Sequence, residues 1–174
     1  MTPPAARITF AEIRGMDRER FVATFGQVFE RSPWVAERAA AARPFATLAA
    51  LHRAMVEAVS VAGLHAQLAL IRAHPDLADG AGIAALTRDS RDEQASAGLD
   101  QCSPAEFERF HRLNRAYRDR FGFPFILAIR NSSRAAILRA FEERLENDRE
   151  AEFARALGEI GKIAYFRLDE LVEQ

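Results

Sequence analysis

Apolar residues recur every three or four positions along most of the chain, which is the spacing of one face of an α-helix. Proline and glycine residues divide this pattern into short segments. We therefore predict an all-α fold and a single compact domain over residues 1–174, with roughly seven or eight helices and with residues 1–7 as a flexible tail. The predicted helices cover residues 16–30, 33–43, 45–59, 63–73, 90–98 and 103–122, followed by one after Ser132 and Ser133 that carries Ile137, Phe141 and Leu145, and one from about residue 150 to the end. In the segment 63–73 we expect Leu64, Leu68 and Ile71 on one apolar side.

The clearest helix is the one predicted over residues 103–122. Ser103 is placed as its N-cap, Pro104 takes the first helical position and Glu106 completes a capping box. Gly122 is expected to end the helix. The apolar stripe consists of Phe107, Phe110, Leu113, Tyr117 and Phe121.

One segment, FPFILAIR at residues 123–130, has no helical pattern and is called the apolar run below. It is too short for its sequence to distinguish a buried strand from a buried helix or loop, and no partner strand is in view, so we expect no sheet. Non-helical backbone inside an apolar wall must still find partners for its N–H and C=O groups. A bound polar ligand is one possible partner.

His74 and Pro75 stand where the apolar pattern of residues 63–73 stops. One interpretation is a helix end, because proline disfavours helix at the preceding residue and the helix dipole favours positive charge at that end. The other is a proton carrier, because histidine titrates near neutral pH. Further along, Ser90 and Glu93 have the spacing of a capping box, with Gly98 as the helix end. A glutamate in the first turn of a helix is also well placed to stay ionised and oriented beside free N–H groups, and Gln94 adjoins it.

Arg167 falls on the apolar stripe of the last helix, where a leucine is expected. The stripe steps through Phe153, Ala156, Ile160 and Ile163 and continues at Leu171. An arginine at this position either extends to the surface or pairs with a buried anion. That anion would be a protein carboxylate or the carboxylate of a substrate.

The formal net charge of the 174-residue chain is −1, which disfavours a nucleic-acid-binding protein because such proteins usually carry a basic face. A single cysteine, Cys102, allows no internal disulfide and fits a reducing compartment. The first residues do not form a secretory signal, and no segment has the ~18 apolar residues that a membrane span needs. We expect a soluble, cytoplasmic protein with no membrane or nucleic-acid partner.

Four segments together resemble the 2-oxo-4-hydroxy-4-carboxy-5-ureidoimidazoline (OHCU) decarboxylase family of urate breakdown. They are HPDLA at 74–78, SRDEQASAGL at 90–99, YRDRFGFPFILAIRN at 117–131 and KIAYFRLDEL at 162–171, in the order in which the family has them. The resemblance implies an all-α homodimeric carbon–carbon lyase that needs neither metal nor organic cofactor. It further implies that the substrate is the unstable ureidoimidazoline and that the products are (S)-allantoin and CO2.

By position, the resemblance places the catalytic histidine on His74 and the catalytic glutamate on Glu93. Because loss of CO2 from such a ring requires control of protons, we expect the two side chains to act as a pair, with His74 protonating the intermediate on one face. The residues implied to contact the substrate are Pro75, Ser90, Gln94, Phe125, Ile126, Leu127, Ala128, Ile129 and Arg167.

Two other functions remain open from the residues alone. A metal-dependent hydrolase would use His74, Asp76 and Glu93, although the spacing of the first two is a weak metal signature. A helical binding module without chemistry would use Ser90 and Glu93 only as a cap and Arg167 only as a surface charge.

Overall fold

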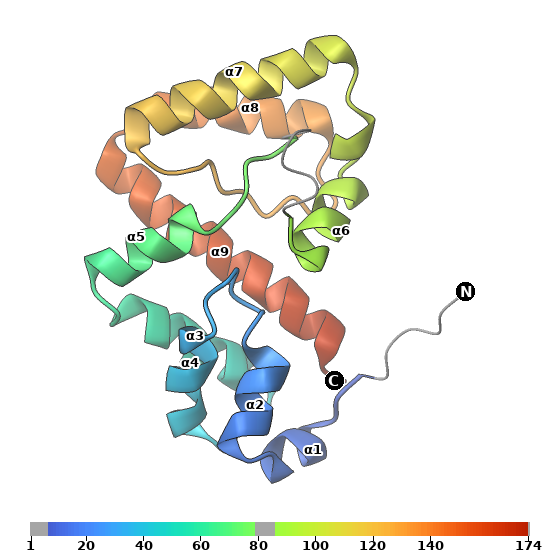
Figure 1. Ribbon diagram of the computed structural model, residues 1–174, viewed down its shortest axis with the longest axis vertical. Helices are drawn as coiled ribbons and strands as arrows, with labels where there is room; N and C mark the ends of the chain where they lie inside the picture. The colour runs from blue at the N-terminus through green and yellow to red at the C-terminus, as the bar shows by residue number, and fades with distance from the viewer. Residues whose placement is uncertain (1–6, 79–85, 174) are drawn as a thin grey trace. The chain divides into compact units, whose positions relative to one another are not determined.

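The computed structural model describes residues 7–78 and 86–173, and these residues are almost entirely helical or connecting segments (Figure 1). The described chain contains nine α-helices, one or two more than the sequence predicts. The unpredicted one is the first, a six-residue helix held by a capping box between Thr9 and Glu12. The only bridge between extended residues in this part of the chain is an isolated one, between Ile8 and Val172. The helices are α1 (Phe10–Gly15), α2 (Arg18–Phe25), α3 (Trp34–Ala39), α4 (Leu48–Ser60), α5 (Leu64–Arg72), α6 (Arg88–Ser96), α7 (Pro104–Phe121), α8 (Arg134–Leu145) and α9 (Arg149–Leu171), with 3-10 turns η1 (Ala40–Ala42) and η3 (Leu99–Gln101).

The chain divides into two compact units. Unit 1 comprises Met1–Leu70 and Gly161–Gln174, and unit 2 comprises Ile71–Ile160. The predicted tail lies outside the described residues except for Arg7, whose Nε donates to the main-chain oxygen of Glu170 at 3.3 Å. The single-domain organisation stays a prediction.

Unit 1 is held by apolar helix faces that the sequence pattern predicts. Phe21 and Phe25 of α2 are at most 1% exposed, and their ring centroids are 4.9 Å apart. Leu51 and Met55 of α4 are fully buried. The exception is α5, where Leu64 is 65% exposed while Leu70 and Ile71 are buried. The predicted orientation of this short helix is therefore wrong at its first turn.

No single helix among the described residues is long and apolar enough to cross a bilayer. Helices α4 and α5 reach that length and composition only as a pair, which is bent by 114°.

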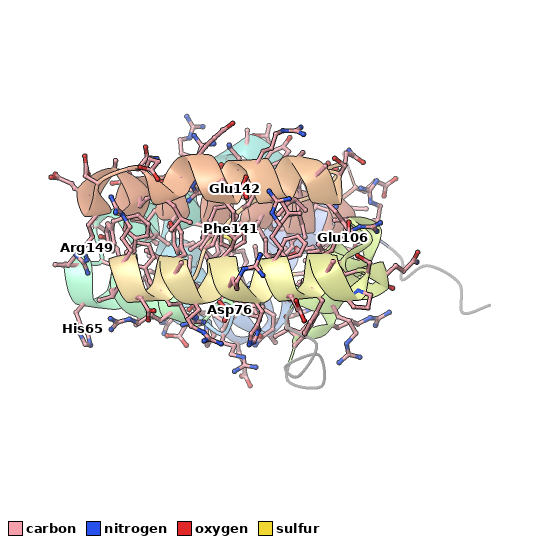
Figure 2. All side chains as sticks on the ribbon, turned by 90° about the horizontal axis from the view of Figure 1, so that it is seen from above. His65, Asp76, Glu106, Phe141, Glu142 and Arg149 are labelled. Carbon is pink, nitrogen blue, oxygen red and sulfur yellow. The ribbon has the colours of Figure 1, made fainter. Side chains whose placement is uncertain are left out.

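Unit 2 is organised by α7 and α8, which lie side by side and run in the same direction (Figures 1 and 2). Near the start of each helix, Arg134 pairs with Glu106 at 3.1 Å. At the other end, Arg149, which follows the end of α8, donates to the main-chain oxygen of Phe121, the last residue of α7, at 3.2 Å. The connection must therefore travel back along most of the 18-residue length of α7, about 27 Å. An extended chain rises about 3.3 Å per residue against 1.5 Å in a helix, so only an extended apolar run can make this return.

The apolar run crosses the aromatic core of unit 2. Phe125 stacks on Phe141 of α8 with ring centroids 3.7 Å apart, and the ring of Tyr117 meets Phe125 edge-on at 5.3 Å. Phe121 and Phe123 complete the cluster, and all five rings are at most 1% exposed. Residues 123–126 are consecutive and buried, which explains why this segment lacks the alternation of polar and apolar residues that a half-exposed strand would show.

A buried ionic network lies against this core. The Arg144 guanidinium holds the Glu152 carboxylate through Nε and Nη2, the latter at 2.8 Å, and it donates from Nη1 to the main-chain oxygen of Ile126 at 2.6 Å. The Tyr117 hydroxyl and the Asn147 amide also donate to Glu152. Burial raises the pKa of the Glu152 carboxyl, but the hydrogen bonds from Arg144, Tyr117 and Asn147 outweigh it, so the net pKa is lowered. Burial raises the pKa of the Tyr117 hydroxyl, and the hydrogen bond to Glu152 raises this pKa further.

The lowered pKa of Glu152 predicts a loss of stability in acid. The unfolded chain takes up the proton near the ordinary value of about 4.5, whereas the folded chain takes it up only at lower pH. The stability due to this carboxylate is therefore complete above pH ~4.5 and is lost as the pH falls through the folded pKa. Urea unfolding at several pH values between 5 and 3 should show a shallower pH dependence for Glu152→Gln than for the wild type. Glu142→Gln, at an exposed pair with Arg109, should keep the wild-type slope; equal slopes for all three proteins would contradict the prediction.

Candidate active site

His74 lies just beyond the end of α5, in an irregular segment of unit 2. Its main-chain N–H donates to the oxygen of Ile71 at 3.2 Å, which closes the last turn of the helix. The side chain is only 6% exposed, and Pro75 after it is half-buried. The predicted helix end is thus confirmed, and the imidazole sits inside the protein rather than in open solvent.

Helix α6 begins one turn earlier than the sequence predicts. The N-cap is Thr87, whose side chain accepts a hydrogen bond from the main-chain N–H of Ser90 at 3.3 Å. Ser90 is therefore the third residue of the helix, and the predicted capping box with Glu93 is wrong. Glu93 lies in the second turn, half-buried, beyond the free N–H groups that the prediction placed beside it. Gly98 follows the C-cap in the left-handed conformation, at φ 71°, as predicted for the helix end.

The Thr87 cap gives a direct test of this corrected start. Thr87→Ala removes the oxygen that accepts the Ser90 N–H, and loss of an N-cap side chain costs about 0.5–2 kcal/mol. Chemical unfolding should show a drop of this size in the free energy of unfolding. Thr87→Ser keeps the hydroxyl and is expected to stay within a few tenths of a kcal/mol of the wild type. Equal stability of the alanine and serine variants would show that the Thr87 hydroxyl does not cap this helix.

Gln94 joins α6 to the segment that follows His74. Its Nε2 donates to the main-chain oxygen of Asp76 at 3.1 Å, and its Oε1 accepts from the N–H of Ala78 at 3.0 Å. Gln94 is 8% exposed, so these two hydrogen bonds fix the main chain that follows His74. The structure thus brings the helix that carries Glu93 against the segment that carries His74.

Helix α7 holds the same segment from its own side. The Asn114 Nδ2 donates to the main-chain oxygen of Leu77 at 2.8 Å, and the Arg118 Nε lies 3.0 Å from both carboxylate oxygens of Asp76. The Asn114 side-chain oxygen is buried and has no hydrogen-bond partner among the described residues. Sequence reasoning missed Asn114. Its position within the apolar stripe of α7, between Phe110 and Tyr117, is the signal that identifies it.

A cavity of about 350 Å³ opens beside Gln94. Residues of α6, η3 and α7 line it, among them Ala95, Leu99 and Phe107. Among the described residues that line this cavity, Gln94 is the one that was predicted to contact the substrate.

The main chain of the segment Phe125–Ile129, called the cradle below, is bound by two charged side chains, and its Ile129 oxygen also accepts from the main-chain N–H of Ser132 at 2.9 Å. Arg144 donates to the oxygen of Ile126, and the Glu159 carboxylate accepts from the N–H of Ala128 at 2.9 Å. These partners were not predicted. The sequence signal that could have identified Arg144 and Glu159 is the one already noted for Arg167. It is a charged residue at a position of a helix where the spacing predicts an apolar one.

Arg167 belongs to unit 1, and its side chain is 4% exposed. Its Nη1 lies 3.1 Å from the Glu30 carboxylate, which is 1% exposed, and 3.4 Å from the main-chain oxygen of Val28. Of the predicted alternatives, burial with an anion is therefore confirmed over extension to the surface. The anion in this structure is a protein carboxylate.

The metal alternative finds little support in the arrangement of ligands. Within residues 7–78 and 86–173, no three His, Cys, Asp or Glu side chains gather as a metal site requires. Asp76, one of the three ligands that this alternative needs, pairs instead with Arg118.

Comparison with known sequences finds relatives that span nearly the whole chain. A sequence model of the OHCU decarboxylase family matches residues 14–169. The 2-oxo-4-hydroxy-4-carboxy-5-ureidoimidazoline decarboxylase of Halalkalicoccus jeotgali is 46% identical over 165 residues, covering 95% of this chain and 92% of that protein. The uric acid degradation bifunctional protein PucL of Bacillus subtilis is 43% identical, and the match covers 95% of this chain and 33% of that longer protein.

Comparison with solved structures agrees. A crystal structure of (S)-allantoin synthase superposes with a TM-score of 0.78 at 31% identity, covering 95% of this chain and 54% of that one. A crystal structure of OHCU decarboxylase in the presence of (S)-allantoin, 21% identical, has the same fold, with a TM-score of 0.66 and coverage of 90% and 98%. The fold and the relatives together define an all-helical decarboxylating lyase. The chain belongs to the OHCU decarboxylase family.

Proposed function

We propose that this protein decarboxylates 2-oxo-4-hydroxy-4-carboxy-5-ureidoimidazoline to (S)-allantoin and CO2 in urate degradation. The observation that carries the proposal is the 46% identity to a decarboxylase of this name over nearly the full length of both proteins. The position of Gln94 supports it, because the amide links the helix of Glu93 to the segment of His74.

The proposed reaction needs control of protons more than an added electron sink. The bond between the ring carbon and the carboxylate breaks and CO2 leaves. The electron pair forms a C=C bond to the neighbouring ring carbon, and the C=N electron pair moves onto the ring nitrogen, which takes up a proton, so that an enol results. The enol hydroxyl then loses its proton as the carbonyl forms, and a proton is added to the carbon that bears the ureido group. One proton taken up overall balances the loss of CO2 from a carboxylate.

We assign these proton transfers to His74 and Glu93. An imidazole can accept one proton and deliver another near neutral pH, and a carboxylate beside it can orient the ring. Because His74 is buried, it can reach the intermediate from one side only, and this would fix the handedness of the product. Surroundings poor in water would also favour loss of the charged carboxylate.

The remaining predicted contacts have orienting roles in this proposal. Main-chain groups of the cradle, with Pro75, Ser90 and Gln94, would hold the ureido group and the ring. Arg167 would bind a substrate carboxylate through its guanidinium. We further propose a homodimer that works in the cytoplasm, without metal or organic cofactor, as the resemblance to the family implies.

A coupled reaction tests the proposed function. Urate is oxidised and hydrolysed in place, the protein is added, and optical rotation is followed. Spontaneous decay of the intermediate gives racemic allantoin, so a rotation that grows with protein concentration supports the proposal. Turnover should survive dialysis against a chelator. Loss of turnover that added metal restores would favour the hydrolase alternative, and no rotation at any protein concentration would overturn the proposal.

A further inference from the structure

Two buried charged side chains hold the cradle at alternate residues. Arg144 of α8 donates to the oxygen of Ile126 at 2.6 Å, and Glu159 of α9 accepts from the N–H of Ala128 at 2.9 Å. Arg144 is 6% exposed and Glu159 is 1% exposed. Both contacts are charge-assisted, which makes them stronger and more directional than contacts between neutral groups.

Alternation along an extended chain then decides which groups face away from α8 and α9. The N–H and C=O of one residue point to the same edge of an extended chain, and those of the next residue point to the opposite edge. Because the Ile126 oxygen and the Ala128 N–H are directed to the two helices, the N–H and C=O of Leu127 are directed away from them.

Each holding side chain is itself held. Arg144 is fixed by the Glu152 carboxylate at 2.8 Å, and its guanidinium carbon lies 4.4 Å from the centre of the Phe125 ring. Glu159 is fixed by Arg155, four residues earlier on α9, at 3.1 Å. The cradle is therefore positioned by rigid helices rather than by its own short loop.

We propose that Arg144 and Glu159 are positioning residues of the decarboxylase, which orient the Leu127 N–H and C=O as a donor–acceptor pair for the amide and ureido groups of the substrate. This inference rests on the proposed function. A ureido group and a ring amide each present N–H and C=O side by side, so the N–H and C=O of one correctly aligned residue can pair with either group. Misplacement of such a contact by about 1 Å can lower the rate ~100-fold.

The test compares variants that release the cradle with variants that disturb only its supports. Glu159→Ala removes the acceptor of the Ala128 N–H, and Glu159→Gln keeps an oxygen there. Arg144→Lys retains a cation that cannot reach Glu152 and the Ile126 oxygen together. Tyr117→Phe and Arg155→Ala are the matched controls, because each removes a contact to Glu152 or Glu159 while both contacts to the cradle remain. Steady-state kinetics of stereoselective allantoin formation and hydrogen exchange of the Leu127 and Ala128 amides are measured for all variants.

We expect Glu159→Ala and Arg144→Lys to raise KM about 10- to 100-fold, with a smaller change in kcat, and to speed exchange at both amides. Glu159→Gln should recover most of the wild-type KM, and the two controls should stay within about twofold of it whatever their thermal stability. A wild-type KM in Glu159→Ala or Arg144→Lys overturns the positioning role, as does an equal rise in the controls. If the wild-type protein forms no optically active allantoin, the proposed function fails, and the exchange data decide the positioning by themselves. In that case faster exchange in both variants supports the positioning, and unchanged exchange overturns it.

Discussion

Replacing His74 by alanine, or Glu93 by glutamine, is expected to abolish protein-dependent formation of optically active allantoin. A positioned acid–base group typically contributes about 10²–10⁴-fold to a rate, so the loss should exceed a hundredfold for each variant. Because the two side chains would act on the same proton transfers, the double variant should be little worse than either single one. The measurement is the initial rate of optical rotation in the coupled reaction.

Two matched substitutions serve as controls. His111→Ala and Glu108→Gln change the same residue types at exposed positions of α7 and should keep the wild-type rate. Circular dichroism at 222 nm, which reports helix content, should be unchanged in all variants. Full stereoselective turnover by His74→Ala or Glu93→Gln would remove that residue from the mechanism, and the protein would need a different proton donor.

The largest effect on stability is expected for Arg167→Ala. The substitution leaves the Glu30 carboxylate, 1% exposed, without the guanidinium that now lies 3.1 Å from it. Removing one partner of a buried ion pair typically costs about 3–5 kcal/mol. Urea unfolding should show a loss of this size, whereas Arg109→Ala, at the exposed pair with Glu142, should change the free energy of unfolding by less than about 1 kcal/mol.

A double variant separates this structural role from substrate binding. In Arg167→Met with Glu30→Gln neither charge is left unpaired, so much of the lost stability should return. If Arg167 also binds the substrate carboxylate, KM stays high in the double variant although the protein is again stable. Recovery of the wild-type KM would limit Arg167 to its pairing with Glu30.

The sequence predicts the class of fold well because the helix signals are local. Ser103, Pro104 and Glu106 act within one turn, and the structure places the start of α7 where they predict it. Thr87 and Ser90 show where local signals compete, because both are hydroxyl residues three positions apart at the start of α6. The start at Thr87 adds a turn to the helix, and Ser90 and Gln94 are buried in it. Their burial depends on packing against the segment after His74. A local sequence pattern at residues 87–93 carries no information about that packing.

The orientation of α5 could not be predicted for a related reason. Its nine residues carry apolar side chains on more than one face, so Leu64 and Leu70 compete for the buried side and only packing decides between them. The partners of the charged residues are also beyond a sequence pattern. Helical spacing shows that Arg144 and Arg167 lie on apolar faces, but the carboxylate of Glu152 comes from α9 and that of Glu30 comes from the connection between α2 and α3.

The parallel arrangement of α7 and α8 constrains how this protein can change. The apolar run makes this return in an extended conformation with its rings packed into the aromatic core, so a deletion inside it would pull those rings out of register with their partners. A single inserted residue would invert every peptide that follows it, and the donor–acceptor pair of Leu127 would exchange places with its neighbours. Insertions and deletions should therefore be tolerated at the exposed turn between α4 and α5, around Gly63, and not between Phe123 and Arg130.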